Sequence, residues 1–237
     1  MNLRFLPNLI SLINLFIGCI TVLLLIENMI ELKYIFILSI ICLILDFLDG
    51  FLARILNAKS ELGLHLDSLA DMVSFGLVPG VLIYNMLLEA PSSSVGSISS
   101  SLIPFTGFIV TLCSAYRLAK FNTTKINSRY FRGLPTPANT LLIFSFSIIS
   151  SEKSLISVFI LDYKFLIIIT LFLCYLLISN VKLLSFKFIN FNFNDNIERY
   201  LLILISLPML LILKIYSIPI IILIYILTSI FVFKFKY

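Results

Sequence analysis

Apolar residues lie along this chain in long blocks that polar residues seldom interrupt, and they do not recur at the intervals of an amphipathic helix or strand. A helix needs about 20 apolar residues to cross the ~30 Å hydrocarbon core of a bilayer. The blocks that approach this length predict membrane spans at residues 8–27, 33–55, 66–88, 101–120, 136–151, 163–180, 198–214 and 216–234. The pattern therefore predicts an all-α fold, a polytopic transmembrane helical bundle of about eight spans (six to eight).

The composition supports this interpretation and narrows the classes of function. Of the 237 residues, 60% are hydrophobic and 12% are charged, and the mean hydropathy is +1.12. A soluble domain carries roughly 25% charged residues. Because the spans leave almost no residues for a folded region in water, we expect a single membrane domain over residues 1–237. Nucleic-acid binding needs a folded basic surface outside the membrane, so we expect no nucleic-acid partner.

The basic residues predict the orientation of the bundle. Cytoplasmic loops of membrane proteins carry an excess of Lys and Arg. With the N-terminus in the cytoplasm, the predicted spans place 13 of the 17 Lys and Arg residues on the cytoplasmic side. The outer side receives only Lys33, Lys153, Lys164 and Lys214. This bias predicts an even number of spans, with both termini in the cytoplasm.

Four aspartates interrupt the apolar pattern. Asp46 and Asp49 lie in the second predicted span, and Asp67 and Asp71 open the third. An aspartate near the centre of a membrane helix costs about 2.5–3.5 kcal/mol on insertion scales, so it is rare without a function. Spacings of three and four residues place each pair on one helix face. The short polar segment 57–61 makes the two helices antiparallel neighbours, and the sequence therefore predicts four carboxyl groups facing one another.

Such a cluster has three interpretations that the residues alone leave open. Carboxylates without His or Cys favour hard divalent ions such as Mg²⁺, Mn²⁺ or Ca²⁺. Two such ions about 3.5–4 Å apart suit phosphoryl chemistry. The alternatives are a cation or proton relay in a transporter, and a structural pair of buried acidic hydrogen bonds.

The residues next to the aspartates favour a diphosphate ligand. Gly50 and Ala53 follow Asp46 on the same helix face, and Gly63 lies one turn before Asp67. Small residues let a ligand or another helix approach the backbone closely. Arg54 ends the second span, where a guanidinium can bind phosphate oxygens with two hydrogen bonds.

Residues 46–71 spell the pattern D-x2-D-G-x2-A-R-x8-G-x3-D-x3-D, which resembles the signature of the CDP-alcohol phosphotransferase family. Within that family, the segments 67–79, 116–122 and 131–137 resemble the phosphatidylserine synthase branch. The opening Leu-Pro-Asn-Leu at 6–9, followed by Asn14, does so too. Lys120 departs from the branch, where we expect arginine, and we assign it no contact. The resemblance covers about residues 6–140, the expected catalytic core, whereas the spans at about 163–234 look generic.

The resemblance implies a reaction and a set of site residues. The enzyme is expected to transfer the phosphatidyl group from CDP-diacylglycerol to the hydroxyl of L-serine, giving phosphatidylserine and CMP. Asp71 is expected to act as general base. The four aspartates are expected to bind two divalent metal ions, Mg²⁺ or Mn²⁺: Asp46, Asp49, Asp67 and Asp71. Three positions match family residues that contact the cytidine diphosphate: Gly50, Arg54 and Ser60.

The sequence indicates the acceptor alcohol and the partners less directly than it indicates the reaction. Serine carries a carboxylate, so we expect a cationic group from Arg117, Arg129 or Arg132 to bind it or the lipid phosphate. Another acceptor, such as glycerol 3-phosphate or inositol, and an archaeal ether-lipid donor stay open, as does a cation-coupled transporter. We expect the protein in a bacterial cytoplasmic membrane among membrane lipids, with its active site facing the cytoplasm. A homodimer is neither supported nor excluded by the sequence.

Overall fold

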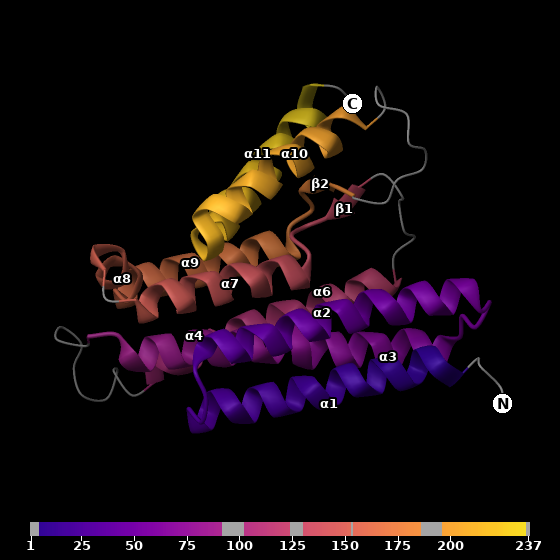
Figure 1. Cartoon of the computed structure of the whole chain (residues 1–237), viewed down its shortest axis with the longest axis horizontal. Coiled ribbons are helices and arrows are strands. Elements are labelled where there is room, and N and C mark those ends of the chain that lie inside the picture. The colour runs from indigo at the N-terminus through magenta and orange to yellow at the C-terminus, as the bar shows by residue number, and fades with distance from the viewer. Residues whose placement is uncertain (1–4, 92–101, 124–129, 153, 186–195, 236–237) are drawn as a thin grey trace.

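The structure, a computed structural model, describes residues 5–91, 102–123, 130–152, 154–185 and 196–235. Residue 101, where one predicted span begins, and the basic residues Lys153 and Arg129 lie outside these ranges. Within them the secondary structure is helical apart from one pair of short strands, so the all-α prediction is confirmed. Figure 1 shows most helices running side by side along the long axis of the molecule.

The first two helices form an antiparallel hairpin. α1 runs from Leu6 to Glu27 and α2 from Leu32 to Ile55. Pro7 lies in the first turn of α1, where its fixed φ and missing N–H cost nothing. Asn28 ends α1 in the left-handed conformation, with φ of 50°, which asparagine tolerates better than most residues. Local residue preferences therefore explain where α1 begins and ends.

The third helical run contains a local change of winding. α3 (Glu61–Met72) continues through the π-helix η2 (Val73–Leu77) into α4 (Val78–Glu89). Pro79 has no N–H to donate to the carbonyl of Phe75. That carbonyl instead accepts from the Thr140 hydroxyl at 3.2 Å, and the carbonyl of Gly76 accepts from Thr111 at 2.9 Å. Side chains from two other helices thus satisfy backbone groups near the π-helix.

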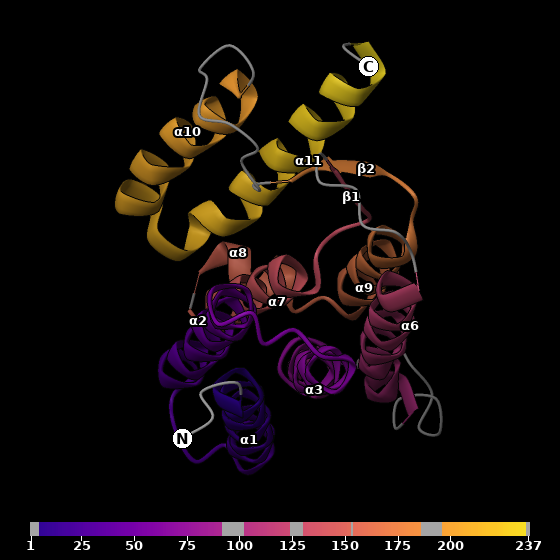
Figure 2. The ribbon, with the colours of Figure 1, turned by 90° about the vertical axis from the view of Figure 1, so that its right-hand side faces the viewer.

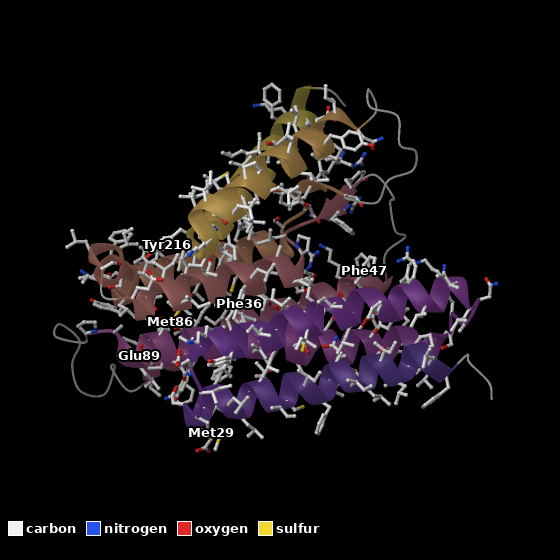
Figure 3. The ribbon with its side chains drawn as sticks, in the orientation of Figure 1. Met29, Phe36, Phe47, Met86, Glu89 and Tyr216 are labelled. Atoms are coloured by element: carbon white, nitrogen blue, oxygen red, sulfur yellow. The ribbon has the colours of Figure 1, made fainter. Side chains whose placement is uncertain are left out.

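Further helices close the bundle around this third run. They are η3 (Ile103–Phe108), α6 (Ile109–Thr123), α7 (Thr136–Ser151), α8 (Leu155–Ile160) and α9 (Tyr163–Ile178). α6 and α7 both pack against η2, and α9 packs against α6. Phe36 of α2, labelled in Figure 3, packs against Phe144 of α7 with the rings tilted and their centroids 5.5 Å apart. The buried apolar core therefore joins helices from both halves of the chain.

Two short strands are the part of the fold that hydropathy did not predict. β1 (Tyr130–Arg132) pairs antiparallel with β2 (Lys182–Leu184). Gly133 follows β1 with φ of +70°, and a Cβ there would lie 2.6 Å from the carbonyl oxygen of Leu177. Only glycine fits this left-handed turn against the end of α9. The strand pair joins the segment just before α7 to the segment just after α9.

The last two helices form a hairpin on one side of the bundle (Figure 2), where α11 packs against α7 and β2. α10 (Ile197–Leu213) and α11 (Ser217–Phe235) are joined by the short 3₁₀ turn η4 (Lys214–Tyr216). α11 contacts β2, where Tyr225 donates to the carbonyl of Leu184 at 2.8 Å. The Leu184 N–H in turn donates to the Ser229 hydroxyl at 3.1 Å.

Long apolar helices identify an integral membrane protein. By length and hydropathy, four runs qualify as spans: Leu6–Glu27, Leu32–Ile55, Glu61–Glu89 and Ile197–Lys234. The turn at η4 divides the last of these into α10 and α11. α7 and α9 are helical as expected but have 16 residues each, so the total of about eight spans stays a prediction.

Candidate active site

Three carboxyl groups converge between α2 and α3. Asp46, Asp49 and Asp67 each offer an oxygen, and these oxygens all lie within 4.8 Å of one another. Asp49 is buried, with 4% of its surface exposed, and the other two are partly buried. The structure thus brings together the aspartates that the spacing placed on facing helices. Together they could hold a metal ion.

Asp71 lies one helical turn beyond Asp67 on α3, so the two side chains share a helix face. Its Oδ1 atom is buried without a hydrogen-bond partner, and so is Oδ1 of Asp67. No salt bridge to any of the four carboxyl groups is found in the described part of the chain. Leaving a buried oxygen unpaired costs about 1–3 kcal/mol, and more when it is charged.

The donor set fits a hard divalent cation. All four side chains supply oxygen ligands, which Mg²⁺ and Mn²⁺ prefer. A cation would satisfy the orphaned oxygen of Asp67 and offset the repulsion between neighbouring carboxylates. The chemistry of the residues present therefore agrees with metal binding at this site.

α1 contacts the acidic cluster through polar side chains. The sequence did not predict these contacts. The Ser11 hydroxyl donates to Oδ2 of Asp49 at 2.6 Å, so it orients that carboxylate. Asn8 lies close to α3, because a Cβ on Gly63 would come within 2.9 Å of the Asn8 amide oxygen. The available signal was the spacing of Asn8, Ser11 and Asn14, three polar residues on one face of an apolar span.

A second set of polar residues, Asn14, Cys42 and Ser74, lies about one helical turn further along the helices. The Ser74 hydroxyl donates to Oδ1 of Asn14 at 3.0 Å. The Cys42 thiol donates to the backbone carbonyl of Asn14 at 3.8 Å. Ser74 follows Asp71 by three residues on the continuous α3–η2 run, so these polar residues lie near the acidic cluster. None of these three residues was expected to take part in the site.

The residues expected to contact the nucleotide lie near the end of α2 and at the start of α3. A Cβ on Gly50 would meet no atom within 4 Å, so packing does not require glycine there. Arg54 is exposed, and its Nε donates to the carbonyl of Gly50 at 2.9 Å. Ser60 is the N-cap of α3, where its hydroxyl accepts from the Gly63 N–H at 3.0 Å. Ser60 therefore has a local structural role.

The three arginines expected near serine occupy different environments. Nη1 of Arg117 donates to the backbone carbonyls of Arg132 at 2.9 Å and of Leu177 at 3.3 Å. These contacts tie α6 to β1 and α9. Arg132 is exposed on β1, and Arg129 lies outside the described residues. His65 is exposed on α3.

Comparison with known proteins adds the family context. The sequence profile described as CDP-alcohol phosphatidyltransferase matches residues 4–176. CDP-diacylglycerol–serine O-phosphatidyltransferase of Methanocaldococcus jannaschii is 33% identical over 173 residues, which cover 73% of this chain and 70% of the relative. The protein of the same name from Bacillus subtilis is 31% identical over 191 residues, covering 78% and 93%. Archaetidylserine synthase of Methanothermobacter thermautotrophicus is 30% identical over 159 residues, covering 66% and 63%.

Proposed function

The chain belongs to the CDP-alcohol phosphatidyltransferase family, and from this premise we propose that it transfers the phosphatidyl group of CDP-diacylglycerol to the hydroxyl of L-serine. The products are phosphatidylserine and CMP. The observation that carries the proposal is the convergence of three carboxyl oxygens within 4.8 Å between two apolar helices. Serine as acceptor is supported by the names of the relatives, which share serine although they differ in the lipid.

In this proposal the four aspartates, Asp46, Asp49, Asp67 and Asp71, would together hold two divalent ions. When bound, the ions neutralise negative charge that develops on the diphosphate oxygens. Ser11 keeps the Asp49 carboxylate in a fixed orientation through its 2.6 Å hydrogen bond. A ligand that is oriented by a second residue binds metal more tightly than a free one.

Asp71 acts as general base. It takes the proton of the serine hydroxyl while that oxygen attacks the phosphorus that carries the lipid. The bond from this phosphorus to the CMP oxygen breaks, and CMP leaves with the electron pair. The transfer is direct, without a covalent enzyme intermediate. The open space beside Gly50 and the exposed guanidinium of Arg54 suit the cytidine diphosphate, which approaches from this side.

We place the site on the cytoplasmic side of a bacterial cytoplasmic membrane. The basis is the excess of Lys and Arg on that side of the expected topology. Arg54 and Lys59, which flank the aspartates, belong to that excess. Arg129 or Arg132 would bind the serine carboxylate or the lipid phosphate, since Arg117 donates to two backbone carbonyls.

A reconstituted assay tests this function. Protein purified into lipid nanodiscs is supplied with CDP-diacylglycerol, Mg²⁺ or Mn²⁺, and one of L-serine, glycerol 3-phosphate or inositol. We expect CMP release that requires both serine and the divalent ion. An ether-linked CDP-lipid in parallel reactions identifies the preferred donor. Release with a different alcohol would overturn the serine assignment, and no release with any alcohol would favour the transporter.

A further inference from the structure

Buried polar atoms without a partner cluster around one part of this membrane bundle. Among the described residues, the buried side-chain atoms that lack a hydrogen bond belong to five residues: Asn14, Asp67, Asp71, Ser114 and Asn139. They lie on α1, α3, α6 and α7, and each of these helices packs against η2. Folded proteins satisfy the large majority of their buried polar side-chain atoms. A concentration of exceptions therefore points to a polar ligand.

Asn14 has the best-defined environment of these residues. Its side chain is 0% exposed. Its Oδ1 accepts a hydrogen bond from the Ser74 hydroxyl at 3.0 Å, which fixes the direction of the amide. Its Nδ2 remains a donor without an acceptor. A buried amide held at one end and unpaired at the other is prepared to donate to something else.

Close helix packing is required to hold Asn14 in this position. A Cβ on Gly18 would come within 2.6 Å of the Ser74 hydroxyl oxygen and within 3.2 Å of a Val73 methyl group. Glycine at this position lets α1 approach η2 closely enough for Ser74 to reach Asn14. Asn14 and Ser74 are 60 positions apart in the sequence, so no local pattern predicts this contact.

Asn14 lies close to the part of α3 that carries Asp71. Asp71 precedes Ser74 by three residues, about one helical turn, on the continuous α3–η2 run, and Ser74 bonds to Asn14. Cys42 of α2 reaches the same residue, because its thiol donates to the backbone carbonyl of Asn14 at 3.8 Å. Nδ2 of Asn14 and Oδ1 of Asp71 each lack a partner, so they are not bonded to each other. A ligand that reached both atoms would accept from Asn14 and donate to Asp71.

A hydroxyl group meets both requirements, because it has one O–H to donate and two lone pairs to accept. We propose that Asn14 binds the acceptor alcohol, donating its Nδ2–H to the hydroxyl oxygen whose proton Asp71 removes. This inference rests on the proposed transfer to an alcohol. One lone pair is occupied by Asn14, and the pair released by deprotonation forms the new O–P bond. The O–P bond to CMP breaks, and the proton stays on Asp71.

The test compares two asparagine-to-aspartate changes. Asn14→Asp keeps the size and the acceptor for Ser74 but removes the free N–H. Asn85→Asp is the matched control, because Nδ2 of Asn85 donates to the backbone carbonyl of Leu25 at 2.9 Å. That contact also joins the third helical run to α1, at the other end of α1. Asn14→Ala serves as a second variant in case the buried carboxylate prevents folding.

Two quantities are measured in nanodiscs: kcat/KM for serine, and the rise in Tm caused by CDP with Mn²⁺. We expect both Asn14 variants to lower kcat/KM for serine at least tenfold relative to Asn85→Asp, with the CDP-induced rise in Tm unchanged. A decrease of less than twofold would overturn the proposal. Parallel loss of nucleotide binding would do so too, because it would indicate a structural role for Asn14.

The wild-type arm separates this inference from the function on which it rests. If the wild type prefers another alcohol, serine is wrong, and the same comparison is made with that alcohol. If the wild type transfers to no alcohol, both proposals fall. If the wild type transfers normally and Asn14→Asp matches the control, only the role of Asn14 is wrong.

Discussion

The first three helical runs and the last two helices differ in what their interiors contain. Between α1, α2 and α3 lie carboxyl groups, a serine and an asparagine, which are expensive to bury in a membrane. α10 and α11 are almost wholly apolar and leave most of their surface outside the protein core. The family match ends at residue 176, before α10 begins. A long apolar sequence is thus sufficient for a membrane span. Polar residues inside a span lower its stability in the membrane, so they indicate where chemistry is expected.

The two regions also differ in the kind of hydrogen bonds that join their elements. In the first region, side chains from separate helices bond to one another, as Ser11 does to Asp49. In the second, the bonds between α11 and β2 run from side chains to backbone, as Tyr225 does to Leu184. We therefore expect changes in the first region to alter catalysis, and changes in the second to alter stability. The following predictions test that division.

Removal of divalent ions is expected to have the largest effect. Chelation should abolish CMP release, because the clustered carboxylates then repel one another and nothing neutralises the diphosphate. Mg²⁺ or Mn²⁺ added in excess should restore release. The measurement is the initial rate of CMP formation before and after chelation. Full activity in the chelator would contradict the assignment of Asp46, Asp49 and Asp67 as metal ligands.

Asp71→Asn should lower kcat by about 10²–10⁴-fold, the usual contribution of a general base. Asparagine keeps the shape of the side chain but cannot take a proton. His65→Asn on the same helix is the control, since His65 is exposed and has no role in the proposed reaction. If both variants retain the wild-type kcat, Asp71 is not the base.

Ser11→Ala should raise the Mn²⁺ concentration needed for half-maximal activity by about 10–100-fold, the usual effect of losing a partner of a metal ligand. Ser206→Ala on α10 is the matched control, because its hydroxyl bonds only within its own helix, to the carbonyl of Ile203 at 3.1 Å. A titration of activity against Mn²⁺ gives the result. Equal midpoints for the two variants would show that α1 does not tune the metal site.

Tyr225→Phe should have the smallest effect, and it should act on stability alone. It removes the hydrogen bond to Leu184, which is worth about 0.5–1.5 kcal/mol. Tm should fall by a few degrees while kcat and both KM values stay unchanged. Thermal unfolding in nanodiscs and the CMP assay provide the two measurements. A loss of kcat would show that the C-terminal hairpin contributes to catalysis, contrary to the division drawn above.

Hydropathy predicted most of the helices because the physics of a span is local. In a bilayer each backbone N–H and C=O must be satisfied within the segment, which leaves an apolar stretch little choice except a helix. The π-helix at Val73–Leu77 and the strands β1 and β2 depend instead on partners distant in sequence. Thr140 and Thr111 bond to carbonyls of η2, and β1 pairs with a segment about 50 residues away. No local pattern marks either.

The sequence by itself determined that this is a membrane protein, and it predicted that four aspartates on two adjoining helices face one another. Spacing within a helix dictates a shared face, and a short connection dictates which helices are neighbours. Only the tertiary structure decided that Ser11 orients Asp49, that Arg117 donates to backbone carbonyls, and that Asn14 is held by Ser74 with an unpaired N–H. These contacts join helices whose mutual rotation depends on close packing such as that of Gly18 against Ser74. Residue spacing along one helix contains no information about that rotation.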